Sequence, residues 1–324
     1  MRVVIAIGGN AIIGEHERGT WAEQRANART VARELVALKR AGHELVLTHG
    51  NGPQVGALHT QHARAAAEVP PLPFDVLVAM TQGQVGYLLQ TAIEDVDASV
   101  RTATVLTRVT VDPEDPSFAE PTKPIGRFFR DEPAARVAAA GGLTVASDAG
   151  RGWRTVVASP QPREIVDFEH VKLLVERGVL VVAAGGGGIP VARRDRRLEG
   201  TQAVIDKDRA SAVLALAVEA DLLVMLTAVQ RVALDFGTRW QRDMARLTVS
   251  DARQLLEAGE FPPGSMGPKV ESGARFAAGG GRAAIVTCAE QLQDAIDATA
   301  GTRIVSDQEG PSATAWPSAA TVAA

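Results

Sequence analysis

The stretch Val3-Val4-Ile5-Ala6-Ile7-Gly8-Gly9-Asn10 opens the chain as a short apolar run that passes directly into two glycines and an asparagine. Apolar runs rich in valine, isoleucine and leucine are typical of strands that are buried on both faces of a parallel sheet. The pattern returns in five later runs, at residues 44–48, 102–106, 179–184, 222–226 and 283–287.

Longer amphipathic segments separate these runs and predict helices. The first begins at Thr20, with Glu23 three residues later as in a capping box, and ends at Gly42. Strands that alternate with helices predict an α/β fold with a mostly parallel sheet, in which ligands bind at the carboxyl ends of the strands. The predicted helices are residues 20–41, 75–96, 167–177, 206–219, 249–258 and 268–277.

One segment interrupts this rhythm. Residues 110–164 contain seven prolines, a density that disfavours a regular core sheet or helix. We therefore expect an inserted subdomain that projects from the body. Residues 307–324 are rich in serine, alanine, threonine and proline, and we expect them to form a disordered tail.

Composition excludes several classes of protein. The chain has 324 residues, a net charge of −4 and a pI of about 5.9, which argues against a general nucleic-acid binder. Its single cysteine, Cys288, excludes an internal disulfide framework and a cysteine zinc site. The sequence contains no run of 18 apolar residues, so no membrane span is predicted, and residues 1–9 lack a signal-peptide pattern. We expect a cytoplasmic protein that does not interact with membranes.

Glycine-rich turns follow three of the predicted strands. They are Gly8-Gly9-Asn10, Gly50-Asn51-Gly52 and the four glycines of residues 185–188. Backbone amides in such turns can bind an anion, so three of them at one sheet edge favour a phosphate-rich ligand. Neither the Walker A loop nor the Rossmann fingerprint is present, because residues 264–269 place Pro268 before the lysine and no G-x-G-x-x-G occurs.

Lysine is rare in this chain and its positions are informative. Of the 34 basic residues, five are lysines and 29 are arginines. Lys207 and Lys269 lie at predicted helix starts, where a cation is disfavoured unless an anion is near, and Lys123 stands between Pro121 and Pro124. Phosphoryl transfer needs positioned positive charge of this kind. His59 and His62 share a helix face but lack further ligands, so we expect no metal held by side chains.

From Val3 to about Ile304 the chain resembles the carbamate kinases, a family within the amino acid kinase superfamily. The most specific similarities are Thr122-Lys123-Pro124-Ile125-Gly126 and Gly264-Ser265-Met266-Gly267-Pro268-Lys269. The resemblance implies an open three-layer α/β/α sandwich over residues 1–306. It places the phosphoryl acceptor in a lobe of residues 1–200, which carries the projecting subdomain, and ATP in a lobe of residues 201–306.

The resemblance also implies roles for individual residues. Most superfamily members have a lysine at the position of Ala6, and in carbamate kinases a lysine of the projecting subdomain, here Lys123, replaces it. Asp206 would orient Lys207 and Lys269. The implied phosphate-binding residues are Gly8, Gly9, Asn10, Gly50, Asn51 and Gly52, and the implied nucleotide-binding residues are Lys207, Thr227, Met266 and Lys269.

The implied reaction is reversible phosphoryl transfer between ATP with carbamate and ADP with carbamoyl phosphate, with Mg²⁺ accompanying the nucleotide. The family further implies a homodimer and a role in the catabolism of arginine or purine nitrogen. Two alternatives share the scaffold: a kinase of another small carboxylate or phosphate acceptor, and a non-catalytic nucleotide-binding homologue. The second alternative draws on Ala228 and Gln230, which stand where the family usually has an acidic residue. A dinucleotide-dependent dehydrogenase is a more distant possibility.

Overall fold

The computed structural model describes residues 1–14, 17–138, 143–147, 152–262 and 264–309. The predicted tail is ordered as far as residue 309, and residues 310–324 lie outside the described part of the chain.

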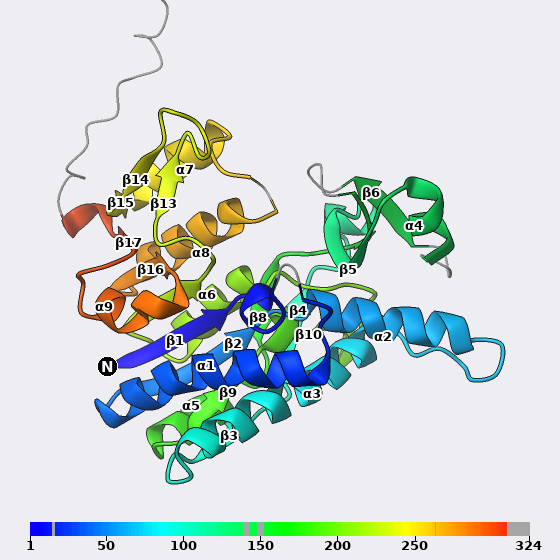
Figure 1. Cartoon of the computed structure of the whole chain (residues 1–324), viewed down its shortest axis with the longest axis horizontal. Helices are drawn as coiled ribbons and strands as arrows, with labels where there is room; N and C mark the ends of the chain where they lie inside the picture. Colours follow the sequence, from blue (N-terminus) through cyan, green and yellow to red (C-terminus); the bar gives the residue numbers. More distant parts are fainter. Residues whose placement is uncertain (15–16, 139–142, 148–151, 263, 310–324) are drawn as a thin grey trace, which may run out of the picture.

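An eight-stranded sheet forms the centre of the molecule (Figure 1). Neighbouring strands run parallel except β16 and β17, which pair antiparallel. The predicted α/β class with a mostly parallel sheet is therefore confirmed. The strand order is β15 (Arg246–Thr248), β17 (Thr302–Val305), β16 (Ala283–Thr287), β12 (Leu222–Leu226), β1 (Arg2–Ile7), β2 (Glu44–His49), β9 (Leu180–Val182) and β3 (Thr102–Thr104).

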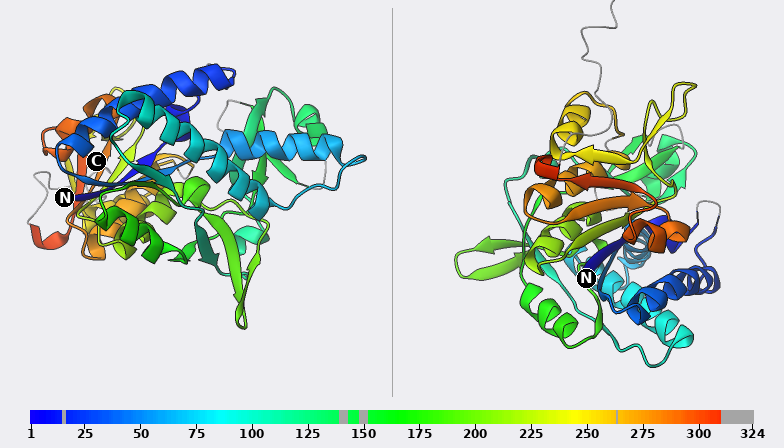
Figure 2. Two further views of the ribbon diagram at one scale, coloured as in Figure 1. Left: turned by 90° about the horizontal axis from the view of Figure 1, so that it is seen from below. Right: turned by 90° about the vertical axis from the view of Figure 1, so that its left-hand side faces the viewer.

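Helices cover both faces of this sheet, as Figure 2 shows. Because successive side chains of a strand point to opposite faces, Val4 and Ala6 of β1 pack into one buried cluster and Val3, Ile5 and Ile7 into the other. The Thr20–Glu23 capping box forms at the start of the first helix. One face carries α1 (Trp21–Arg40), α3 (Phe74–Val96) and α9 (Leu292–Ile296); the other carries α5 (Phe168–Glu176), α6 (Lys207–Ala217), α7 (Val249–Glu257) and α8 (Met266–Ala278).

Two smaller sheets involve the proline-rich segment, where the sequence disfavoured regular core structure. The prolines of this segment that fall within strands lie at sheet edges: Pro124 is in the edge strand β5 and Pro162 begins the edge strand β8. The four-stranded sheet has the order β11 (Arg197–Gly200), β10 (Ile189–Arg194), β4 (Arg108–Val111) and β8 (Pro162–Ile165). The three-stranded sheet has the order β5 (Lys123–Phe129), β7 (Trp153–Val157) and β6 (Thr144–Ser147).

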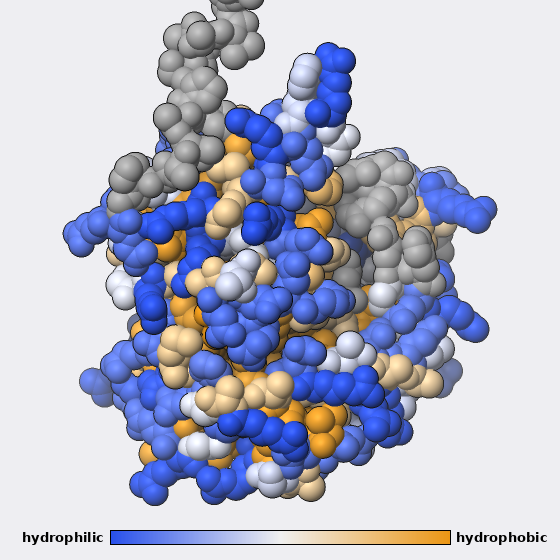
Figure 3. Space-filling model, turned by 60° about the vertical axis from the view of Figure 1, so that its left-hand side comes forward, coloured by the Kyte–Doolittle hydropathy of each residue, from blue (hydrophilic) through white to orange (hydrophobic). Residues whose placement is uncertain are grey.

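The three-stranded sheet and α4 (Glu132–Ala138) form the unit drawn in green that stands away from the central sheet in Figure 1. We call it the projecting unit, residues 123–157. The helix α2 (Gly52–Ala65) runs beneath it and packs against β5. On the opposite side of the molecule β13 (Val232–Leu234) and β14 (Arg242–Met244) form a hairpin. On the face shown in Figure 3, polar side chains surround small, separate apolar patches.

Candidate active site

The glycine-rich turns meet at the carboxyl ends of the central strands. β1 lies between β2 and β12, so the chain leaves β1 at the point where the strand order reverses, which is where open α/β sheets bind ligands. A Cβ on Gly50 would lie 3.2 Å from the amide nitrogen of Gly9, and one on Gly8 would lie 3.2 Å from the Leu226 oxygen. The backbones approach closely here because these residues have no side chain.

The third turn packs against side chains of the second. A Cβ on Gly186, whose φ is +64°, would lie 2.2 Å from Nδ2 of Asn51, and one on Gly185 would lie 2.2 Å from Nε2 of His49. Asn51 is fixed in turn, because its Nδ2 donates to Oγ1 of Thr81 at 2.9 Å. The first two turns therefore meet backbone to backbone, and the third packs on the side chains of His49 and Asn51.

Two of the predicted lysines are held by one carboxylate. Lys207 is the first residue of α6, and its Nζ lies 2.5 Å from Oδ1 of Asp208. Lys269, in the first turn of α8, donates from Nζ to Oδ2 of Asp208 at 3.0 Å. The side chain of Asp208 is only 5% exposed, so it forms a buried bridge between the two helix starts.

The third lysine reaches the same place from the projecting unit. Lys123 begins β5, and its Nζ donates to Oδ2 of Asp206 at 2.7 Å. The other oxygen of Asp206 caps α6 by accepting from the amides of Asp208 at 2.9 Å and Arg209 at 3.3 Å. One carboxylate thus ties the projecting unit to the start of α6.

The contacts differ from the sequence expectation in one respect. Asp206 was expected to orient Lys207 and Lys269, but the carboxylate that contacts both is Asp208, which sequence reasoning did not include among the site residues. The signal was present in Asp206-Lys207-Asp208, two acids flanking a lysine at a helix start. Sequence alone did not show which of the two acids would face inward.

Charge and burial oppose each other in this cluster. Burial alone would raise the pKa of Asp206, but the charge and hydrogen bond of Lys123, together with Lys207 and Lys269, hold that pKa well below its usual range. The pKa of Asp208 is also lowered, because Lys207 and Lys269 outweigh its burial. Burial lowers the pKa of Lys207, partly offset by Asp208. Both carboxylates are therefore ionised at neutral pH.

His49, at the end of β2, is a neutral neighbour of these charges. Burial lowers its pKa to about 4, and the charge of Lys207 acts in the same direction, while the Gly50 backbone opposes them. Its Nδ1 lies 3.0 Å from the Gly50 oxygen, so Nδ1 carries the proton and donates to that oxygen. The uncharged ring fixes the turn without adding a further cation.

These groups surround a cleft of about 1170 Å³ between the sheet edge and the projecting unit. Gly8 precedes the cleft at the end of β1, Asn10 lies in the 3-10 helix Gly9–Ala11, Thr227 follows β12, and Met266 begins α8 and packs on the core. Gly8, Thr227 and Met266 are not among the residues that line it. The predicted residues that line it are Gly9, Gly50, Asn51, Gly52, Lys123, Asp206, Lys207 and Lys269.

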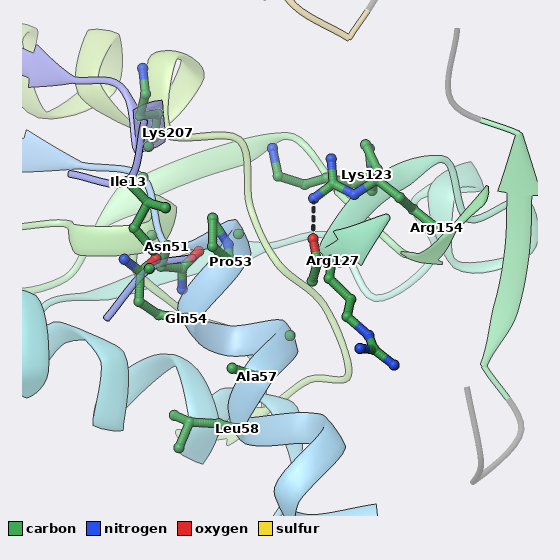
Figure 4. Close-up of a pocket in the computed structure, with 18 of the residues that line it drawn as sticks. Ile13, Asn51, Pro53, Gln54, Ala57, Leu58, Lys123, Arg127, Arg154 and Lys207 are labelled. Atoms are coloured by element: carbon green, nitrogen blue, oxygen red, sulfur yellow. Dashed lines mark hydrogen bonds between the residues drawn. The ribbon is translucent and has the colours of Figure 1, made fainter. Parts of the chain in front are cut away.

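Arginines extend the positive surface of the cleft. Arg127 of β5 and Arg154 of β7 both line it, and Figure 4 shows the side chain of Arg154 beside that of Lys123. Arg154 donates from Nη2 to the Gly126 oxygen at 2.9 Å. Sequence reasoning did not include either arginine in the site, because nothing in the local pattern distinguishes them from the chain's many other arginines.

The described residues contain neither a cluster of metal ligands nor a membrane-spanning helix. No group of three or more histidine, cysteine, aspartate or glutamate side chains has the geometry to hold a metal ion in that part of the chain. None of the helices in the same ranges is long and apolar enough to cross a membrane.

The α/β fold, the glycine turns and the three converging lysines indicate that this is a phosphoryl-transfer protein. Its similarity to known proteins supports that class. The amino acid kinase family model matches residues 1–288. Carbamate kinase from Pyrococcus furiosus is 43% identical over 94% of this chain and 99% of its own. A carbamate kinase-like protein of Escherichia coli, YqeA, is 44% identical over 94% and 98%. The structure of carbamate kinase from Giardia lamblia bound to AMP-PNP has a TM-score of 0.85 and 40% identity, covering 94% of this chain and 98% of that one. The chain belongs to the amino acid kinase family and, within it, to the carbamate kinases.

Proposed function

We propose that the protein is a carbamate kinase that transfers a phosphoryl group reversibly between ATP with carbamate and ADP with carbamoyl phosphate. The observation that carries the proposal is the convergence of Lys123, Lys207 and Lys269 on one cleft beside the glycine turns. These lysines come from three separate segments of the chain. Relatives named carbamate kinase, at about the same length, support the choice of acceptor.

The reaction needs little proton chemistry. In the ATP-forming direction an oxygen of the terminal ADP phosphate attacks phosphorus, the bond from phosphorus to the carbamate oxygen breaks, and carbamate leaves with that electron pair. In reverse, carbamate attacks as an anion and needs no general base. The protein therefore contributes position and charge.

The geometry suggests how the cations divide this work. Lys207 and Lys269, fixed by Asp208, would bind the nucleotide phosphates and the transferring group from the side of residues 201–306. Lys123 would contact the carbamoyl phosphate from the side of residues 1–200. The backbone amides of the turns at Gly9 and Gly50 would bind the phosphoryl oxygens between them.

Magnesium would enter with the nucleotide. Mg²⁺ prefers oxygen ligands and in such sites is commonly held by substrate phosphates with one or two carboxylates. Among the described residues, three carboxylates line the cleft: Asp206 and Asp208 already face lysines, and Glu17 accepts from the Gly14 amide and from Nδ2 of Asn27. They fit a role beside a magnesium–nucleotide complex better than a resident metal site. The structure of a relative with AMP-PNP supports nucleotide use.

The deciding experiment measures ATP formation from carbamoyl phosphate and ADP, coupled to hexokinase, with and without Mg²⁺. Magnesium-dependent turnover at millimolar substrate is expected, and its absence with folded protein would contradict the proposal. An acceptor screen tests the other-acceptor alternative. Tight ATP binding without turnover would favour the non-catalytic homologue. A homodimer, a cytoplasmic location and a role in nitrogen catabolism are proposals from family membership alone; light scattering tests the first.

A further inference from the structure

The projecting unit rests on the body of the molecule through a contact between two glycines. Gly56 lies in the second turn of α2, and a Cβ placed on it would lie 2.2 Å from both the nitrogen and the Cα of Gly126 in β5. No side chain can occupy that space without moving one backbone away from the other. Gly126 has a φ of +71°, so its own conformation also favours glycine.

Side chains on either side hold Gly126 in this place. Ile125, the preceding residue, is 1% exposed and packs in a small buried cluster with Val55 of α2. From the neighbouring strand, Arg154 donates to the Gly126 oxygen at 2.9 Å, the interaction drawn as a dashed line in Figure 4. The contact is therefore a defined seat for β5 on α2.

The same strand carries Lys123 to the start of α6. Lys123 pairs in register with Val157 of β7, and the residue after it, Ala158, forms a bridge to Ala203. The amide of Val204 then donates to the Ala158 oxygen at 3.0 Å. Two residues further on is Asp206, the partner of Lys123.

The helix beneath the seat also belongs to the cleft. α2 begins at Gly52, in the turn that lines the cleft, and Gly56 follows one helical turn later. α2 thus connects the glycine turn after β2 to the strand that carries Lys123. A shift of β5 relative to α2 would move the Lys123 ammonium relative to that turn.

We propose that Gly56 and Gly126 form a backbone seat whose closeness sets the reach of Lys123 into the cleft, so that Gly56 is a positioning residue for phosphoryl transfer. This role for Gly56 rests on the proposed function. Gly56 lines the cleft with backbone only and carries no side chain that could act on substrate, so its effect would pass through β5 to the lysine.

The first test is Gly56→Ala, with Gly83→Ala in α3 as a matched control. Gly83 is also a helical glycine, but a Cβ there meets nothing within 4 Å. Gly56→Ala is expected to lower kcat for ATP formation at least tenfold, because transition-state charge stabilisation depends on fixed distances, while the Kd for ADP stays within about twofold. Gly83→Ala is expected to retain wild-type kcat.

A double-mutant cycle separates positioning from general damage. If Gly56 acts through Lys123, then adding Gly56→Ala to Lys123→Ala should change kcat by less than about twofold. An undiminished loss in that background would show that the methyl group acts elsewhere, for example on the turn at Gly52, and would overturn the proposal.

Hydrogen–deuterium exchange tests the seat without relying on activity. Gly56→Ala should accelerate exchange of peptides covering residues 123–129 while leaving the central strand β1 unchanged, and Gly83→Ala should do neither. Unchanged exchange in 123–129 would refute the seat. Wild-type protein that makes no ATP, combined with accelerated exchange in Gly56→Ala, would refute the proposed function and leave the seat standing.

Discussion

Replacing Asp208 by asparagine removes one negative charge from between two lysines and keeps the shape of the side chain. Each contact, at 2.5 Å to Lys207 and 3.0 Å to Lys269, has a gross attraction of about 6 kcal/mol at an effective dielectric constant of about 20. Most of this attraction offsets the cost of burying the charges. Breaking a buried pair by removing one partner typically costs about 3–5 kcal/mol.

We expect that cost to be visible in catalysis. If about 3 kcal/mol of it falls on the transition state, kcat decreases roughly 100-fold. The pH dependence should also change. Burial already lowers the pKa of Lys207, and Asp208 is the main group that raises it again. Without that carboxylate, Lys207 loses its proton at lower pH, so the alkaline limb of the pH–kcat profile should move toward acid.

The assay is hexokinase-coupled ATP formation between pH 6 and 10, with circular dichroism to verify folding. Glu219→Gln is the control, because Glu219 also pairs with a lysine, at 2.7 Å from Lys172, but is 72% exposed. That variant should remain within about twofold of wild type. A folded Asp208→Asn enzyme with wild-type kcat and an unshifted profile would refute the assigned role of the bridge.

Three further outcomes are expected. Lys123→Ala should lower kcat by roughly 100-fold or more with little change in the Kd for ADP. Lys123→Arg should recover only part of that loss, because a guanidinium differs in shape from an ammonium. Equal kcat in wild type, Lys123→Ala and Lys123→Arg would remove this residue from the mechanism. The pKa of His49 is about 4 in the folded protein and about 6.5 in the unfolded chain, so the unfolded state takes up protons first as pH falls. The free energy of unfolding should therefore decrease by up to about 3 kcal/mol between pH 6.5 and 4. Urea midpoints should show this decrease in wild type and a smaller one in His49→Gln. Thr20→Ala breaks the exposed capping box of α1 and should cost about 1 kcal/mol of stability with unchanged kcat, measured by the same urea titration.

Six of the eight strands of the central sheet could be predicted, because most of them are apolar runs buried on both faces, whereas β15 and β17 were not predicted. β12 and β16 have the predicted bounds, and β1 and β2 differ from them by one residue at one end. β3 and β9 are each shorter than the apolar runs that predicted them, since pairing stops before the hydrophobic pattern does. The two smaller sheets were not predicted. Their strands mix charged residues, glycine and proline with apolar residues, so composition does not separate them from loops.

The features of the site that depend on residue type could be predicted. Those that depend on the direction in which a side chain leaves its helix could not. A lysine at a helix start implies an anion, and both Lys207 and Lys269 do face one. In the structure, however, the anion is the Asp208 carboxylate of the protein and not a bound phosphate. Asp206 and Asp208 are two positions apart at the start of α6, so they leave the helix in different directions, one toward β5 and one toward α8. That division follows from helix geometry and from which segments pack nearby, and local sequence contains neither.

The pairing of the lysines explains how this cleft can hold three cations before any substrate binds. Three ammonium groups and two carboxylates leave one net positive charge among these five side chains, so their mutual repulsion is largely offset. Each lysine is also held by a carboxylate on the rigid start of α6, not by the ligand. Phosphoryl oxygens that enter therefore meet donors already in position, and little reorganisation is left for the transition state. The scarcity of lysine has a consequence here: an arginine in place of Lys207 or Lys269 would bring a larger planar group to a carboxylate that is 5% exposed. Charge alone does not distinguish lysine from arginine at these positions, whereas the space around the buried carboxylate favours the smaller ammonium group.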